Sequence, residues 1–368
     1  MFLFRTSERI LAGRGAIREL GREAARLGSR ALLVTGRRSL AAGGKLDSIL
    51  VGLNEAGVET SVFREISGEP DVVDVDRARE AAKRIRAEVI LAAGGGSVMD
   101  LGKATGALAG EEEPTRVFHA GKTTERTGLP VIACPTTSGS GAEVTPNAVL
   151  GDKETRMKKS LRVEGLLPRV AIVDPELAAS GPREVTASAG MDAFTQAVES
   201  FLSIKGSPMT RALSREAAKL IAGNLARVVE DGSDLEAREA MSWGSLLAGI
   251  ALANARLGAV HGIAHPLGAL YGLPHGVVCA ALLPHVLEIN RAARDPYREL
   301  ARALGEDPAE LARKLLEKVG LAADLKGLGV KREDWGRIVE ESLPSGSLAA
   351  NPVPFDAAKV MQVLDAVS

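Results

Sequence analysis

The chain has 368 residues, of which 45% are hydrophobic and 25% charged, and its formal net charge is -1. That length predicts two domains, each large enough to bury a core of its own. The near-neutral charge argues against nucleic acid or an anionic membrane surface as the main partner, because both attract proteins with a clustered positive field.

Targeting and redox signals favour a cytoplasmic protein. The first eleven residues already carry three charged side chains, so they predict no signal peptide. The longest apolar stretch, residues 243–273, is interrupted by Arg256 and two histidines, so it predicts no membrane-spanning helix. Cys134 and Cys279 are too few and too far apart for a disulfide framework. We therefore expect a soluble cytoplasmic protein without a membrane partner.

The first half of the chain alternates short apolar runs with helical patterns. Apolar β-type runs predict strands over residues 30–35, 58–66, 88–93, 130–134 and 169–173. Helical spacing predicts helices over residues 46–56 and 72–86, and another that ends near residue 109. Strands separated by helices of this length indicate βαβ units and a parallel, Rossmann-like sheet.

After Pro182 the strand signals stop and long Ala/Leu-rich segments follow. Their apolar residues recur at spacings of three and four, which predicts helices. These helices are expected over residues 183–202, 212–229, 235–265, 275–290, 296–304 and 308–319. The fold class is therefore an α/β N-terminal domain, residues 1–180, followed by an all-α C-terminal domain, residues 181–368.

A glycine turn follows the predicted strand 88–93. Gly94, Gly95, Gly96 and Ser97 lead from that strand into a helix, where backbone N–H groups and the helix N-terminus favour a phosphate. Ser97 and Asp100 have the spacing of a capping box, which would fix the start of that helix. The spacing differs from G-x-G-x-x-G, and a tight turn that simply needs glycine is the structural alternative.

A second turn of small residues, 135–141, follows the predicted strand 130–134. Thr136, Thr137 and Ser140 offer hydroxyl groups for a pyrophosphate or a nicotinamide amide, whereas a plain flexible loop is the alternative. Because both turns follow parallel strands, they lie at the same edge of the sheet, where α/β folds bind their ligands. Together the two turns predict a dinucleotide site.

The choice of cofactor is indicated at the end of the predicted strand 30–35. Enzymes that select NAD usually place Asp or Glu near the ribose 2′-hydroxyl, whereas a 2′-phosphate attracts Arg. Here Gly36 takes the strand-end position and Arg37 and Arg38 follow. This pattern favours NADP, with NAD possible; a pair of solvated arginines is the alternative.

The helical half contains a cluster of potential metal ligands. Asp192 and Gln196 are four residues apart on one predicted helix, and His261 and His265 repeat that spacing on another. His275 follows on a predicted loop, residues 266–275. A single buried histidine is more often a hydrogen-bonded core residue. A carboxylate with two or three converging imidazoles fits a divalent transition metal better.

Several motifs in the same order resemble the iron-containing (group III) alcohol dehydrogenase family, which shares the dehydroquinate synthase-like fold with glycerol dehydrogenases. The resemblance runs over nearly the whole chain. It rests on residues 94–103 (GGGSVMDLGK), 135–145 (PTTSGSGAEVT), 172–177 (IVDPEL), 260–268 (VHGIAHPLG) and 273–276 (LPHG).

The resemblance implies an NAD(P) cleft between the domains and a divalent metal, Fe²⁺ or Zn²⁺, in the helical domain. The implied metal ligands are Asp192, Gln196, His261 and His275, and the implied catalytic residue in the substrate and nicotinamide pocket is His265. The remaining implied residues bind the cofactor: Gly36, Arg37, Arg38, Gly94, Gly95, Gly96, Ser97, Asp100, Thr136, Thr137, Ser140, Lys158 and Leu177.

The expected reaction is reversible hydride transfer between the nicotinamide and a small alcohol or aldehyde, in a homodimer or larger homo-oligomer. One position departs from the family pattern, since Gln196 stands where the family usually carries His. A site of Asp192, His261 and His275 could suffice; without a metal, His265 would become the proton donor.

Other functions stay open. The chain could be a polyol or glycerol dehydrogenase, or resemble maleylacetate reductases, which lack the usual metal dependence. A carboxylated substrate would require a cationic pocket, and residues 260–276 contain no Arg or Lys, which favours an uncharged substrate. Gln196 could also mark a catalytically degenerate NADP-binding protein, although the retained histidines argue against it.

Overall fold

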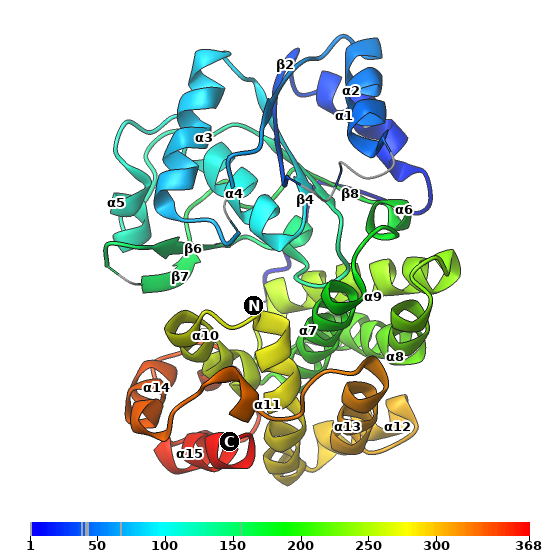
Figure 1. The fold of residues 1–368 in the computed structure, drawn as a ribbon, viewed down its shortest axis with the longest axis vertical. Coiled ribbons are helices and arrows are strands. Elements are labelled where there is room, and N and C mark those ends of the chain that lie inside the picture. The colour runs from blue at the N-terminus through cyan, green and yellow to red at the C-terminus, as the bar shows by residue number, and fades with distance from the viewer. Residues whose placement is uncertain (1, 38–39, 41–43, 67, 156) are drawn as a thin grey trace. The chain divides into compact units, whose positions relative to one another are not determined.

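The computed structural model describes residues 2–37, 40, 44–66, 68–155 and 157–368. Its chain forms two compact units (Figure 1). The strand unit comprises Thr6–Thr137 and Gly141–Gly181. The helical unit comprises Pro182–Ser368 together with Ser138–Ser140 and the residues up to Arg5.

A six-stranded parallel sheet forms the centre of the strand unit, as the alternating pattern predicted. Its strands, in spatial order, are β1 (Arg9–Ala12), β8 (Val170–Val173), β5 (Val131–Pro135), β4 (Val89–Gly94), β2 (Arg30–Thr35) and β3 (Glu59–Phe63). After β2 the chain adds β3 on one side and then crosses back to place β4 on the other. The strand order therefore reverses between β2 and β4, which is the switch point where open α/β sheets bind ligands.

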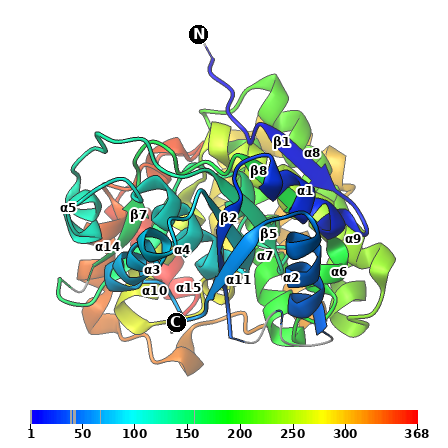
Figure 2. The same cartoon turned by 90° about the horizontal axis from the view of Figure 1, so that it is seen from above.

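The two faces of the sheet are buried in separate cores because successive strand residues point to opposite sides. Leu32 and Ile90 pack in one core with α3 (Val72–Arg84) and α4 (Gly96–Ala107). Leu33 and Leu91 pack in the other core with the helices α1 (Leu20–Ala25), α2 (Lys45–Glu55) and α6 (Pro175–Ala178). Figure 2 shows α3 and α4 on one side of β2 and α2 on the other. Burial on both faces explains why β2 and β4 are continuous apolar runs.

An antiparallel pair, β6 (Ala148–Asp152) and β7 (Met157–Leu161), and the short helix α5 (Thr115–Ala120) complete the α3–α4 side. The sequence did not predict this pair, nor the edge strand β1. Alternate residues of β6 are buried, and Leu150 and Leu161 join the core, whereas β7 is mostly polar. Such short, half-exposed strands carry little apolar signal.

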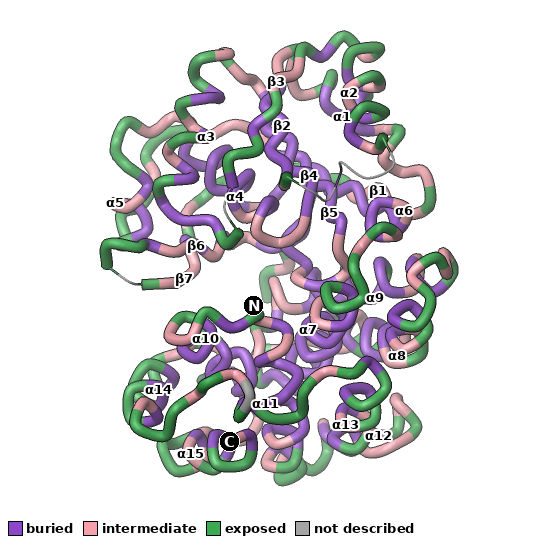
Figure 3. The backbone as a smooth tube through the Cα atoms, viewed as in Figure 1, coloured by how far each residue is buried: buried purple, intermediate pink, exposed green. Residues whose placement is uncertain are grey.

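The helical unit is built from long helices around one apolar core, as predicted. Figure 3 shows the middle of this unit buried and its outer turns exposed. Its helices are α7 (Arg183–Leu202), α8 (Pro208–Glu230), α9 (Leu235–Ala255), α10 (Ala259–Tyr271), α11 (His275–Asn290), α12 (Asp295–Leu304), α13 (Pro308–Val319), α14 (Trp335–Ser342) and α15 (Ala357–Ala366).

Two predictions in this unit are wrong. Residues 235–265 do not form one helix, because the chain turns at Arg256, whose φ is 64°, and starts again as α10. Residues 266–275 are not a loop, because α10 runs through Pro266 to Tyr271 and ends at Gly272 with a φ of 63°. His275 is instead the first residue of α11.

The membrane prediction concerns this same region. Among the described residues, no single helix is long and apolar enough to cross a membrane. Within the described ranges, one bent pair, α9 and α10, passes that test by length and composition, with an angle of 99° between the two helices.

Candidate functional site

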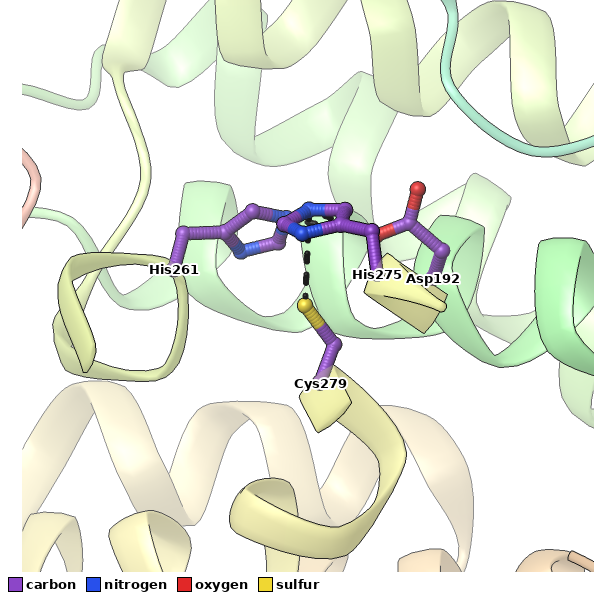
Figure 4. Close-up of side chains that lie close together, drawn as sticks. All are labelled: Asp192, His261, His275 and Cys279. Carbon is purple, nitrogen blue, oxygen red and sulfur yellow. Dashed lines mark hydrogen bonds and ion pairs between the residues drawn. The ribbon is translucent and has the colours of Figure 1, made fainter. Parts of the chain in front are cut away.

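Four side chains of the helical unit converge on one point. Asp192 comes from α7, His261 from α10, and His275 and Cys279 from the first turns of α11. Their potential ligand atoms all lie within 4.8 Å of one another. Figure 4 shows the two imidazoles side by side, with the carboxylate and the thiol directed toward them. The donor types are those of a divalent metal site.

Close packing of α11 against α7 creates this convergence. Gly276 follows His275 directly, and a Cβ at that position would lie 2.2 Å from the carbonyl oxygen of Ser188 in α7. Only glycine allows the two backbones to approach so closely. As a result, Nε2 of His275 lies 3.7 Å from Oδ1 of Asp192.

Two polar atoms at this point are buried without a hydrogen-bond partner. They are Oδ1 of Asp192 and Nε2 of His261, and they lie 3.3 Å apart. The two atoms form an ion pair but no hydrogen bond with each other, so both can bind one cation placed between them. A carboxylate oxygen and an imidazole nitrogen are both common ligands of Zn²⁺ and Fe²⁺, so the residues fit such an ion.

Gln196 lies next to this cluster, one helical turn from Asp192 on α7. Its Nε2 donates a hydrogen bond to Oδ2 of Asp192 at 3.0 Å. Its carbonyl oxygen Oε1 is buried without a hydrogen-bond partner. The amide therefore holds the Asp192 carboxylate and keeps one free acceptor beside the site.

Glu199 is a site residue that the sequence interpretation missed. One of its oxygens accepts a hydrogen bond from Nδ1 of His261 at 2.6 Å, and the other accepts one from the backbone N–H of Val260, also at 2.6 Å. A carboxylate on Nδ1 leaves Nε2 as the ring nitrogen that could bind a metal. The helical spacing 192, 196, 199 along one face was the available signal. Cys279 was missed as well, although it lies four residues after His275.

The ionisable groups of the cluster stabilise one another's charged forms. Burial raises the pKa of Asp192, but the imidazoles of His275 and His261 outweigh it and hold that pKa below its usual value. Burial lowers the pKa of His261, but Cys279, Glu199 and Asp192 raise it well above its ordinary value. Burial also lowers the pKa of His275, but Cys279 and Asp192 raise it above its ordinary value. This pocket therefore favours positive charge, and a divalent cation would have to displace the imidazole protons to bind there.

His265 lies at the exposed side of the cluster. Its ring stacks on that of His275, with centroids 5.4 Å apart and an angle of 12° between the planes. It meets His261 edge-on at 6.1 Å. His265 thus has one side on the His261 and His275 rings and the other side exposed.

Most of the predicted dinucleotide residues of the strand unit gather at one edge of the sheet. Register places Thr35 beside Ala93, and Gly94 beside Pro135, so the carboxyl ends of β2, β4 and β5 are neighbours. The segments that follow are Gly36 and Arg37, Gly94 to Ser97, and Thr136 and Thr137. They flank the switch point between β2 and β4.

Gly94 and Gly95 shape the turn at the end of β4. A Cβ on Gly94 would lie 2.6 Å from Cβ of Val98, so this position admits only glycine. Gly95 caps α4, which begins at Gly96, and the backbone N–H of Thr136 donates to the carbonyl oxygen of Gly94 at 2.9 Å. The glycine turn and the threonine loop are thereby joined, and the open N-terminus of α4 is suited to a phosphate.

The capping box expected from Ser97 and Asp100 is wrong. Gly95 is the N-cap residue of α4, and no side chain caps the helix. Asp100 instead accepts a hydrogen bond from the backbone N–H of Val149 at 2.9 Å and pairs with the buried Lys103 at 2.9 Å. The Asp100 carboxylate therefore links α4 to β6 and does not cap the start of α4.

The other predicted cofactor residues lie in different surroundings. Leu177 is buried in the α1–α2 core, and Lys158 on β7 pairs with Glu69 at 2.5 Å. Ser140 belongs to the helical unit, where the neighbouring Ser138 and Ser242 hydroxyls are 3.2 Å apart. Arg38 lies outside the described residues.

Comparison with known proteins agrees with both halves of this description. The iron-containing alcohol dehydrogenase family profile matches residues 7–175, and the C-terminal profile of the Fe-containing alcohol dehydrogenase family matches residues 186–368. The chain is 38% identical to a 1,3-propanediol dehydrogenase of Citrobacter freundii over 341 residues, 88% of each chain. It is 31% identical to an NAD-dependent methanol dehydrogenase of Bacillus methanolicus over 365 residues, 96% of each.

Solved structures resemble the chain over its full length. A 1,3-propanediol oxidoreductase superposes with a TM-score of 0.94 at 36% identity, covering 100% of both chains. A sulfoacetaldehyde reductase of Bifidobacterium kashiwanohense, in complex with NAD⁺, superposes with a TM-score of 0.93 at 30% identity, covering 100% of this chain and 98% of that one. The chain therefore belongs to the iron-containing alcohol dehydrogenase family and is an oxidoreductase that acts on CH–OH groups.

Proposed function

We propose that this enzyme interconverts a small uncharged alcohol and its aldehyde, with NADP(H) as the preferred cofactor and a divalent metal held by Asp192, His261 and His275. The observation that carries the proposal is the 3.3 Å approach of two buried atoms, Oδ1 of Asp192 and Nε2 of His261, which form an ion pair but no hydrogen bond. Nε2 of His275 lies close by, and a shared cation would satisfy all three. Gln196 stands beside them with its free carbonyl oxygen.

The metal, when bound, supplies Lewis-acid polarisation of the substrate oxygen. The protein's own contribution is to hold the ligands ready. Glu199 fixes the Nδ1 proton of His261, and Gln196 fixes Oδ2 of Asp192, so neither ligand has to reorganise. Preorganisation of this kind is the main way a protein strengthens a charged site.

His265 is proposed as the residue that exchanges the alcohol proton with solvent. It stacks on His275 and has an exposed side, so its ring can lie between the ligand cluster and water. Lining the substrate pocket is its alternative role. In a metal-independent enzyme, the second candidate, this exposed histidine would itself be the general acid.

The dinucleotide supplies the hydride, and the strand unit is proposed to bind it. The backbone N–H groups at Gly95, Gly96 and Ser97 would hold phosphate at the start of α4, and the hydroxyls of Thr136 and Thr137 would face it from the neighbouring loop. Further proposed cofactor residues are Gly94, Asp100, Ser140, Lys158 and Leu177.

A preference for NADP rests on the end of β2. Gly36 offers no carboxylate to bind a ribose 2′-hydroxyl, and the exposed Arg37 follows it. Arginine recognises phosphate through a planar set of donors, so a 2′-phosphate would gain what a 2′-hydroxyl would not. Arg38 is proposed to assist.

An uncharged substrate is supported by the site motif. Residues 260–276, which carry His261, His265 and His275, contain no Lys or Arg that could pair with a carboxylate. Two relatives are named for 1,3-propanediol and methanol, which are small uncharged alcohols, whereas the sulfoacetaldehyde reductase is named for a substrate with a sulfonate group. Glycerol and other polyols remain within the same substrate class.

The decisive experiment is NADPH oxidation with a short aliphatic aldehyde, on chelator-stripped enzyme before and after addition of Fe²⁺ or Zn²⁺. We expect activity only after metal addition, and a higher kcat/KM with NADPH than with NADH. Equal rates in both samples would show that the metal takes no part in the reaction. They would favour His265 as the proton donor. No turnover with any small alcohol or aldehyde, despite tight NADPH binding, would favour a binding function.

A further inference from the structure

We infer that Cys279 is the fourth protein ligand of the metal, bound as a thiolate, so that the donor set is Asp192, His261, His275 and Cys279. This inference rests on the metal-assisted function proposed above and adds a ligand to its site. Binding would release the thiol proton to solvent without electron transfer.

The placement of Cys279 on α11 makes it a neighbour of a proposed ligand. It lies four residues after His275, so both side chains project from the same face of the helix. Its Sγ is 3.6 Å from Nε2 of His275, the nitrogen that also approaches Asp192 (Figure 4). The Cys279 side chain is fully buried, so it faces the cluster and not the solvent.

The distances between donors match a tetrahedral ion. With Zn–N and Zn–O near 2.0–2.2 Å and Zn–S near 2.3 Å, tetrahedral angles separate N and S donors by about 3.6 Å and N and O donors by about 3.4 Å. The observed separations are 3.6 Å between His275 and Cys279, 3.3 Å between Asp192 and His261, and 3.7 Å between Asp192 and His275. Three of the six donor pairs are thus spaced about as a bound metal requires, and all four donor atoms lie within 4.8 Å of one another.

Gln196 is better explained as a positioning residue. Its Nε2 donates to Oδ2 of Asp192, which leaves Oδ1 as the oxygen that faces the histidines. A neutral carboxamide oxygen is also a weaker donor than a thiolate for a borderline-soft ion such as Zn²⁺. The structure therefore offers a stronger fourth ligand than the one that the sequence suggested.

A thiolate ligand has consequences for metal choice. Soft ligands favour Zn²⁺ over harder ions such as Mn²⁺ and Mg²⁺. Mixed thiolate and imidazole sets also support catalysis, since zinc alcohol dehydrogenases use two Cys and one His. We expect this enzyme to retain Zn²⁺ more tightly than the Cys279→Ser variant does, by at least about tenfold.

The direct test is optical and needs no turnover. Apoenzyme is titrated anaerobically with one equivalent of Co²⁺, and metal content is measured by mass spectrometry. Wild-type protein should show a near-ultraviolet thiolate-to-cobalt charge-transfer band, which Cys279→Ser should lose. Cys134→Ala is the matched control, because Cys134 is the other cysteine of the chain and lies in the strand unit. Both Cys134→Ala and Gln196→Ala should keep the band.

A second measurement protects the test against a variant that fails to fold. In the Cys134→Ala background Cys279 is the sole thiol, and X-ray absorption at the zinc edge should show one sulfur at about 2.3 Å. Stoichiometric cobalt binding without the band, or bound Zn²⁺ without a sulfur neighbour, would overturn the Cys279 assignment while leaving the metal-assisted function intact. Failure of any metal to bind, together with metal-independent aldehyde reduction, would overturn both.

Discussion

Glu199 of α7 accepts a hydrogen bond from Nδ1 of His261 at 2.6 Å, and its second oxygen accepts one from the backbone N–H of Val260. One buried carboxylate therefore fixes both the start of α10 and the orientation of the imidazole on it. Because α10 begins after a sharp turn at Arg256, this bond determines where the Nε2 atom of His261 lies.

Replacing Glu199 by Gln should weaken metal binding without removing a ligand. The amide cannot hold the His261 ring as a carboxylate does, and loss of such outer partners typically lowers metal affinity by about 10–100-fold. Competition of Zn²⁺ with a coloured chelator measures this directly. Glu184→Gln, at an exposed position of the same helix, is the control and should bind Zn²⁺ like wild type. Unchanged affinity in Glu199→Gln would contradict a positioning role.

The two glycines at the end of β4 should respond differently to alanine. Gly94→Ala places a methyl group 2.6 Å from Val98 and should destabilise the fold by about 1–3 kcal/mol. Gly95 has a φ of -74°, which alanine adopts, and its added methyl would touch Thr137 at only 3.7 Å. Gly95→Ala should therefore keep the free energy of unfolding but weaken NADPH binding by about tenfold, because the methyl blocks close approach of the pyrophosphate.

Calorimetric titration with NADPH and denaturant unfolding separate these two effects. Equal NADPH affinity in Gly95→Ala and wild type would show that the turn at β4 does not approach the cofactor.

Gly36→Asp should reverse the cofactor preference. A carboxylate at the end of β2 can accept hydrogen bonds from a ribose 2′-hydroxyl and repels a 2′-phosphate, so the ratio of kcat/KM for NADPH over NADH should fall at least about tenfold. Arg302→Ser removes an exposed arginine from α12 in the helical unit and should leave the ratio unchanged. If the wild-type enzyme had a lower kcat/KM with NADPH than with NADH, the proposed NADP preference would be refuted.

Glu143 should make stability depend on pH. Burial raises the pKa of this carboxyl from 4.5 to about 7, more than the charge of Lys103 lowers it. Between those two values the folded protein keeps a proton that the unfolded chain releases. The stabilisation is therefore complete below pH 4.5 and is lost as the pH rises through about 7, a change of up to about 3 kcal/mol in the free energy of unfolding.

Glu143→Gln keeps a neutral side chain at every pH and should remove this slope. Denaturant unfolding at several pH values would show the variant gaining stability relative to wild type as the pH rises. Glu59→Gln, at an exposed position on β3, should follow the wild-type curve. Parallel curves for wild type and Glu143→Gln would mean that Glu143 is already ionised in the folded protein.

Much of the fold was predictable because local pattern and tertiary environment agree. The apolar run over residues 30–35 is β2, and the periodic segments over 183–202, 275–290 and 308–319 are α7, α11 and α13 with those bounds. The β6–β7 pair was not predictable, since only alternate residues of β6 are buried and most of β7 is polar.

By itself, the sequence determined which residues are available for chemistry. Helical spacing placed Asp192 with Gln196 and His261 with His265, a predicted loop supplied His275, and the turns after β4 and β5 indicated a phosphate site. The spacing of residues along one helix, however, does not tell which face of a second helix will pack against the first. Only the tertiary structure brought Cys279 and Glu199 to the histidines, because the bend at Arg256 and the close contact at Gly276 decide where α10 and α11 meet α7.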